Sequence, residues 1–146
     1  LKNFAALTTS VSNISSQISG LLRQGRRLAI WGGTGKCAAF MHHYGITCED
    51  IQIVVDSDHR KVGTFVPGVG QEIKSPQELL KFKPDILIIP TQWRAQDILL
   101  EACDFGIEFD IALIEHEGSL VDFALGEHPY SMDKYLLSLA QRSALR

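Results

Sequence analysis

The sequence predicts an α/β protein built in three layers, with a mostly parallel sheet of four to five strands and helices on both faces. Short apolar runs alternate with amphipathic stretches along the chain, which is the order that a parallel sheet with crossover helices produces. The apolar runs are rich in Ile, Val and Leu, as strands buried on both faces are. The first run stops at glycines, and a helical pattern follows at once.

Four apolar runs are the expected strands. Their short length and β-branched content favour buried strands over helices. Proline or glycine, or a polar residue, bounds each of them. The expected strands are Leu28–Trp31, Ile51–Asp56, Asp85–Pro90 and Phe109–Ile114.

Amphipathic patterns predict the helices. Apolar residues three or four positions apart over residues 3–24 predict a first helix, which Gly25 ends. Ser75 and Glu78 form a capping-box pattern around Pro76, a residue suited to the first position of a helix. Further helices are expected over residues 34–44, 76–83, 93–105 and 131–145.

Charge and composition exclude several classes of function. The net charge of −3 and the absence of a basic stripe argue against nucleic-acid binding. The chain shows neither an apolar run of membrane-spanning length nor a signal peptide, so we expect a cytoplasmic protein without a membrane partner. Cys37, Cys48 and Cys103 lack metal-binding spacing and indicate reduced thiols. The chain begins at Leu1 instead of Met, which favours a processed chain or a piece of a longer one.

The glycines after the first expected strand carry the clearest functional signal. Gly33-x-Gly35-x-x-Ala38 fits the permissive dinucleotide-binding fingerprint of Rossmann-like folds. Glycines allow a tight turn and close approach of a ligand to the backbone, and the helix that follows directs unpaired N–H groups at an anion. Asp56 follows the second strand, where the fingerprint places a carboxylate for a ribose hydroxyl. The expected ligand-binding residues of this turn are Gly32, Gly33, Thr34, Gly35 and Lys36.

These glycines allow two other interpretations. A phosphate-binding P-loop is disfavoured, since the position five residues before Gly35 is Ile30 and the residue after Lys36 is Cys37. The glycines could also form a strand-to-helix turn that binds nothing. On the fingerprint interpretation, residues 1–25 form an amphipathic helix, residues 26–125 a Rossmann-like domain, and residues 126–146 a C-terminal helix packed on the same domain.

The ends of the expected strands converge at one edge of a parallel sheet, where ligands bind in such folds. Asp56 either holds a ribose or caps the Asp-Ser-Asp turn. His59, Arg60 and Lys61 suit a diphosphate, but a solvated loop is an equal alternative. Trp93 could stack on a base or sugar, although packing is favoured.

Two histidine-containing segments carry weaker signals. Residues 115–117 (Glu-His-Glu) carry groups of the kind that act as general acids and bases, but an exposed polar strand end is the favoured interpretation. His42 and His43 lie on a predicted helix; one of them could face the core, and they indicate no metal site. We therefore expect no catalytic residue and no metal ligand in this chain.

A longer pattern extends from Arg27 to Asp122. It consists of Trp-Gly-Gly-Thr-Gly-Lys (31–36), Tyr-Gly-Ile (44–46), Ile-Val-Val-Asp-Ser-Asp-His-Arg-Lys-Val-Gly (53–63), Val-Pro-Gly-Val (66–69), Ile-Lys-Ser-Pro-Gln-Glu-Leu (73–79), Lys-Pro-Asp-Ile-Leu-Ile-Ile-Pro (83–90) and Trp93. In this order the segments resemble the C-terminal domain of the sugar C-methyltransferases, which methylate a carbon of dTDP-linked keto-sugars. The resemblance covers about two thirds of the chain.

This resemblance implies that substrate binding and methyl transfer belong to different domains. In the resembled enzymes a zinc-binding segment and a middle domain that holds S-adenosylmethionine precede this domain, and the middle domain carries the catalytic base. The resemblance thus implies a substrate-side or scaffolding domain that binds a nucleotide-sugar or similar molecule beside a companion methyltransferase domain. The motif residues that carry over are Gly33, Gly35, Asp56, His59, Lys61 and Pro67-Gly68.

Three functions therefore follow from the sequence, in descending order. The first is the nucleotide-sugar-binding domain of a methyltransferase. The second is a non-catalytic interaction module, or a homodimer, in which the terminal amphipathic helices pack on a partner. The third is a domain that itself binds NAD or S-adenosylmethionine; a free-standing NAD-dependent oxidoreductase is least favoured, since the chain has no room for a substrate domain.

Overall fold

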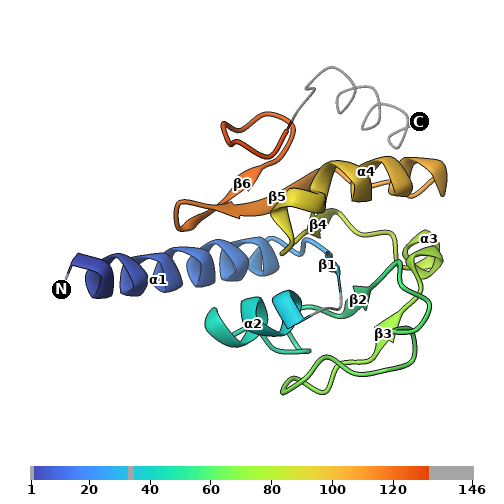
Figure 1. Cartoon of the computed structure of the whole chain (residues 1–146), viewed down its shortest axis with the longest axis horizontal. Helices are drawn as coiled ribbons and strands as arrows, with labels where there is room; N and C mark the ends of the chain where they lie inside the picture. The colour runs from blue at the N-terminus through green and yellow to red at the C-terminus, as the bar shows by residue number, and fades with distance from the viewer. Residues whose placement is uncertain (1, 33–34, 132–146) are drawn as a thin grey trace.

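A six-stranded sheet forms the centre of the molecule in the computed structural model, which describes residues 2–32 and 35–131, with side chains from Asn13 onward (Figure 1). The strand order is β3-β2-β1-β4-β5-β6. All neighbours pair in parallel except β5 and β6, which are antiparallel. The strands are β1 (Leu28–Trp31), β2 (Ile53–Val55), β3 (Ile73–Lys74), β4 (Ile86–Ile88), β5 (Ile111–His116) and β6 (Ser119–Asp122).

Helices cover both faces of this sheet. Residues of β1 alternate between two apolar clusters: Leu28 and Ile30 pack with the first two helices, and Ala29 and Trp31 pack with the last two. Each face therefore has its own core, and the predicted three-layer α/β fold is confirmed. The helices are α1 (Lys2–Arg23) and α2 (Gly35–His43) on one face, and α3 (Leu79–Phe82) and α4 (Ala95–Asp104) on the other.

The sheet has more strands than the four to five that the sequence predicts. The two additional strands are β3, which has only two residues, and β6, which is mostly half-buried. Neither gives an apolar run long enough to be recognised as a strand. The four predicted strands all form, with ends that differ by up to two residues. The predicted helix over 131–145 falls almost entirely outside the described residues.

The predicted capping box at Ser75 is wrong. Ser75 makes no side-chain cap, because the Glu78 N–H that it would accept bonds to the Ser75 carbonyl instead, at 3.1 Å. The segment starts as a 3₁₀ turn, η1 (Pro76–Glu78), with Pro76 at its first position as predicted. A similar turn, η2 (Gln92–Arg94), precedes α4.

A tight hairpin joins β5 to β6 at the carboxyl end of β5. Its two turn residues, Glu117 and Gly118, both have positive φ, at 50° and 83°, as a type I′ turn requires. The Gln17 amide on α1 bonds to both the N–H and the carbonyl of Leu120, at 2.8 and 3.0 Å. This side chain covers part of the exposed edge of β6 and fixes α1 against the hairpin.

The strand order reverses at β1 and β4, which is the point where open α/β sheets form a crevice. The chain leaves β1 toward β2 on one side and leaves β4 toward β5 on the other, so the crossovers diverge at this point. In open α/β sheets, ligands bind outside the carboxyl ends of the strands where the order reverses.

Candidate functional site

Four segments meet at the carboxyl edge of the sheet, as the sequence predicts. Gly32 directly follows β1, and Asp56 directly follows β2. Residues 90–94 come after β4, and Glu115 lies near the end of β5. Because neighbouring parallel strands hold these ends in register, residues far apart in sequence share one edge.

Gly32 is the glycine that the backbone requires within the described part of the turn. It is buried, has a φ of 119°, and its N–H donates to the Val55 carbonyl at 2.7 Å. Gly35, at the start of α2, has open space around the position of an added Cβ atom. Gly33 and Thr34 lie outside the described residues, so their predicted ligand contacts stay predictions.

Lys36 and Trp93 approach each other across the crevice. The Lys36 Nζ lies 5.9 Å from the centroid of the Trp93 ring, within the range of a cation–π contact. Trp93 is 64% exposed, so the favoured interpretation of this residue as a packing residue is wrong. Gln92 before it and Ala95 after it are buried, so Trp93 lies on the outward side of the η2 turn.

A cavity of about 150 Å³ lies between α2 and the ends of β4 and β5. Gln92, only 6% exposed, donates to both the carbonyl and the carboxylate Oε2 of Glu115, at 3.1 and 3.0 Å. The Gly118 N–H donates to Glu115 Oε1 at 3.1 Å. The cavity is lined by Lys36, Ala39, Phe40, His43, Tyr44, Pro90, Gln92 and Glu115.

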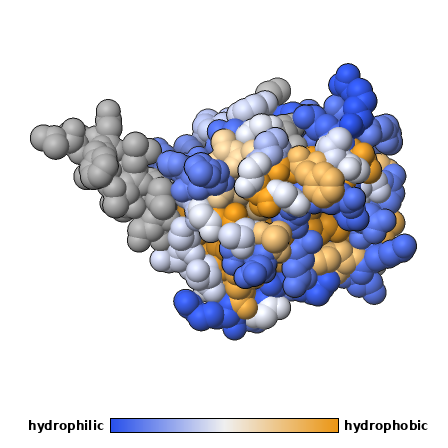
Figure 2. Space-filling model, turned by 90° about the horizontal axis from the view of Figure 1, so that it is seen from below, coloured by the Kyte–Doolittle hydropathy of each residue, from blue (hydrophilic) through white to orange (hydrophobic). Residues whose placement is uncertain are grey.

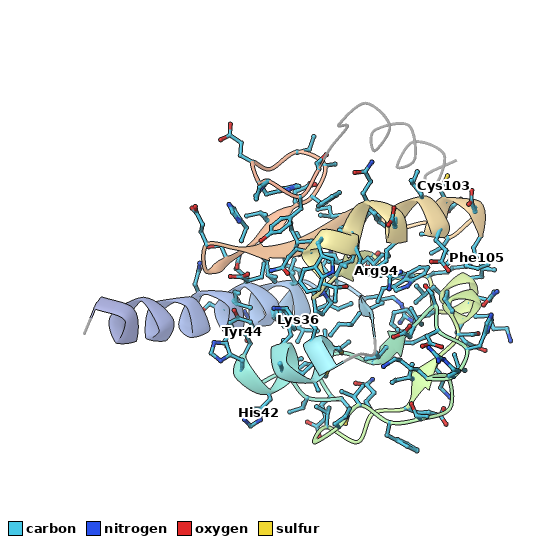
Figure 3. All side chains as sticks on the ribbon, in the orientation of Figure 1. Lys36, His42, Tyr44, Arg94, Cys103 and Phe105 are labelled. Carbon is cyan, nitrogen blue, oxygen red and sulfur yellow. The ribbon has the colours of Figure 1, made fainter. Side chains whose placement is uncertain are left out.

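Tyr44 forms the end of this cavity near α1. Burial, together with the nearby Glu115 carboxylate, raises the pKa of Tyr44. Its backbone carbonyl accepts a hydrogen bond from Ser15 Oγ on α1 at 2.9 Å, and its ring packs edge-on against Phe40. Figure 3 shows Lys36 and Tyr44 on the side of α2 that faces α1 and His42 on the opposite side.

Asp56 acts in the described structure as the cap of its own turn. It is 6% exposed, and its Oδ1 accepts the Asp58 N–H at 2.8 Å, as the Asp-Ser-Asp interpretation predicts. Burial, and to a lesser degree the charge of Asp56, raises the pKa of Cys37 to about 12. A hydrogen bond from a ribose hydroxyl to Asp56 stays a prediction.

The basic residues beyond Asp56 differ in what they contact. Arg60 donates from Nε and Nη2 to the Asp58 carboxylate, both at 3.1 Å, and these bonds lower the pKa of Asp58. His59 is exposed and Lys61 is half-buried. The guanidinium of Arg60 is therefore paired with Asp58 but stays exposed, and a contact of His59, Arg60 or Lys61 with a diphosphate stays a prediction.

The histidine and glutamate segments differ from the sequence interpretation. His42 and His43 are both exposed, so neither faces the core, and His43 lines the cavity. Glu115 is not simply an exposed strand end, because its carboxylate is held by Gln92 and Gly118. Gln92 lies in the segment 90–94 that the sequence predicts at this edge, but sequence reasoning did not single it out; its signal is a polar side chain two residues after Pro90. Within residues 2–32 and 35–131, no group of His, Cys, Asp or Glu is arranged to hold a metal ion.

A larger cavity, of about 370 Å³, lies at the opposite, amino edge of the sheet, around Pro84 and Phe109. The Asp85 carboxylate in this cavity accepts the Arg27 N–H at 2.7 Å and so ties β4 to β1. Despite its smaller size, the carboxyl-edge cavity is the better candidate, since it lies where the strand order reverses and has an exposed aromatic ring beside it.

Comparison with known proteins identifies one family. A family model described as the C-methyltransferase C-terminal domain matches residues 1–111, about three quarters of the chain. A search of curated proteins finds no match. Among the described residues, the structure has no helix that is both long and apolar enough to cross a membrane.

Proposed function

Because the chain belongs to the family of C-methyltransferase C-terminal domains, we propose that it binds or scaffolds the nucleotide-sugar substrate of a methyltransferase without itself carrying the methyl-transfer chemistry. The observation that carries this proposal is the approach of Lys36 and Trp93 across the crevice between β1 and β4. A cation suits a diphosphate, and an exposed indole suits a base or sugar ring.

The arrangement of the edge supports an elongated ligand. Asp56 stands after β2, Lys36 lies in the first turn of α2, and the cavity beside Glu115 lies toward β5. These groups follow one another along the carboxyl edge, as the parts of a nucleotide joined through a diphosphate would. S-adenosylmethionine and the catalytic base belong, in this proposal, to a companion domain.

Calorimetric titration of the chain with dTDP-glucose, dTDP, NAD and S-adenosylmethionine tests the proposal. We expect binding of the dTDP compounds, weakened about tenfold or more by Trp93→Ala or Lys36→Met, since base stacking is worth about 1–3 kcal/mol and a hydrogen bond to a charged group about 1.5–3 kcal/mol. Phe65→Ala and Lys81→Met are matched controls, because both residues are exposed and neither lines the cavity. Failure of both dTDP compounds to bind at millimolar concentration would remove the proposal, and selective binding of NAD or S-adenosylmethionine would support the third function.

An interaction module is a second candidate, because one sheet face has an incompletely filled groove. A cavity of about 280 Å³ lies between α1 and the β4–β6 half of the sheet, lined by Leu21, Ile111 and Leu113 among others. Figure 2 shows that hydrophobic residues also gather on the face seen from below, among hydrophilic ones. Light scattering distinguishes the candidates: a monomer that binds nucleotide favours the first, and a dimer that binds none favours the second.

A further inference from the structure

The cavity between α2 and the ends of β4 and β5 has its own ligand chemistry. We propose that it holds the glycosyl group of the nucleotide-sugar, with the Glu115 carboxylate accepting hydrogen bonds from that group. This inference rests on the proposed function and adds the position of the sugar and the residue that recognises it. It concerns the β5 side of the edge, which the cavity joins to Lys36 at the end of the glycine turn and which lies away from Asp56.

Glu115 is held in place yet keeps acceptor capacity. Gly118 N–H donates to one carboxylate oxygen and Gln92 Nε2 to the other, so the side chain is fixed from two sides. A carboxylate offers about four lone-pair sites, and these two bonds use only half of them. Gln92 is itself only 6% exposed, so it fixes Glu115 from within the protein and not from solvent.

The size of the cavity fits one ring and not a whole ligand. Its volume of about 150 Å³ is well below the roughly 300–1,000 Å³ of pockets that enclose complete ligands. Ala39, Phe40 and Pro90 supply apolar walls beside the polar end. A sugar has the same combination, with an apolar C–H surface and hydroxyl groups at its rim.

Charge determines which part of the ligand enters. Glu115 and Lys36 both line the cavity: Glu115 carries its negative charge at the β5 end, and Lys36 carries its positive charge at the start of α2, next to Trp93. A phosphate beside Glu115 would place like charges together, whereas hydroxyl groups donate to a carboxylate. The diphosphate is therefore placed at Lys36, and the neutral glycosyl group at Glu115.

Calorimetry with dTMP, dTDP and dTDP-glucose tests this placement. We expect the unmodified chain to bind dTDP-glucose about tenfold more tightly than dTDP, since hydrogen bonds to a charged group are strong. Glu115→Gln preserves the shape of the side chain and an oxygen for the Gly118 N–H, but its NH2 group replaces the oxygen that accepts from Gln92; it should bring this ratio close to one while dTDP affinity stays unchanged. Glu117→Gln, at the exposed tip of the same hairpin, is the control and should keep the ratio.

A second variant covers the case in which Glu115→Gln unfolds. Ala39→Leu adds volume from an exposed position on the cavity wall, and should weaken dTDP-glucose but not dTDP. Equal affinity of the unmodified chain for dTDP and dTDP-glucose would overturn the inference and leave the proposed function standing. Equal weakening of all three compounds by Glu115→Gln or Ala39→Leu would place the nucleoside in the cavity and also overturn it. If none of the compounds binds, the proposed function fails, and this inference fails with it.

Discussion

Charged side chains are bonded at both edges of the sheet, but only the carboxyl edge sets an exposed aromatic ring beside a cation at the point where the strand order reverses. At the amino edge, Arg27 stacks on Phe82 at 4.1 Å and donates twice to the Phe82 carbonyl, while Asp85 accepts the Arg27 N–H. At the other edge, Trp93 stays largely exposed beside Lys36. The same sheet thus has one edge suited to stability and one suited to binding, and substitutions at the two edges should separate these properties.

Gly32→Val should have the largest effect, because it alters both properties at once. The φ of 119° at this buried position is strained for a β-branched residue, which costs about 1–3 kcal/mol of unfolding free energy. Urea unfolding measures the loss. Gly35→Ala is the matched control: its Cβ meets open space, so stability should hold while nucleotide affinity falls. An equal loss of stability in both variants would contradict the distinction between the two glycines.

Arg27→Ala should affect the amino edge alone. Removing the cation–π contact and the bonds to the Phe82 carbonyl should cost about 1–2 kcal/mol of unfolding free energy. Affinity for dTDP-glucose should stay unchanged, because Arg27 lies at the far end of β1 from the crevice. Lys81→Ala, an exposed cation on α3, provides the control for both measurements. A change in affinity would show that the two edges are coupled.

Cys37 adds a pH dependence to the carboxyl edge. Burial raises the pKa of its thiol from 9.0 to about 12, so the unfolded chain loses this proton first as the pH rises. Stability from this group is complete below pH 9 and falls by about 1.4 kcal/mol per pH unit until the pH passes about 12. Unfolding curves of the unmodified chain and Cys37→Ala should therefore converge over this range. Parallel curves would show that Cys37 is accessible in the folded chain.

Arg60→Ala should have the smallest effect. Its ion pair with Asp58 is exposed, and such pairs contribute little to stability, so the melting temperature should not change measurably. Removing the guanidinium raises the pKa of Asp58 toward its ordinary value, which NMR titration of the carboxylate can follow. A clear drop in melting temperature would mean that the Asp56 loop contributes more to the fold than its exposure indicates.

Local patterns predicted much of the architecture. Buried parallel strands such as Leu28–Trp31 can be recognised by their uninterrupted apolar residues. The helix α1 can be recognised by apolar residues three or four positions apart. The turn at Asp56 was also predictable as an alternative, because an Asp side chain bonds to the backbone two residues on. The strands β3 and β6 were not predicted, because each forms by pairing with a neighbouring strand and not from a long apolar run of its own.

By itself, then, the sequence determined the α/β class, the first strand and the place of the glycine turn, since each depends on residues close together along the chain. Only the tertiary structure decided that Trp93 is exposed beside Lys36 and that Gln92 fixes Glu115. These contacts join residues separated by 57 and 23 positions. Strand order alone brings such residues to one edge, and strand order is set by how the whole sheet packs between its two layers of helices.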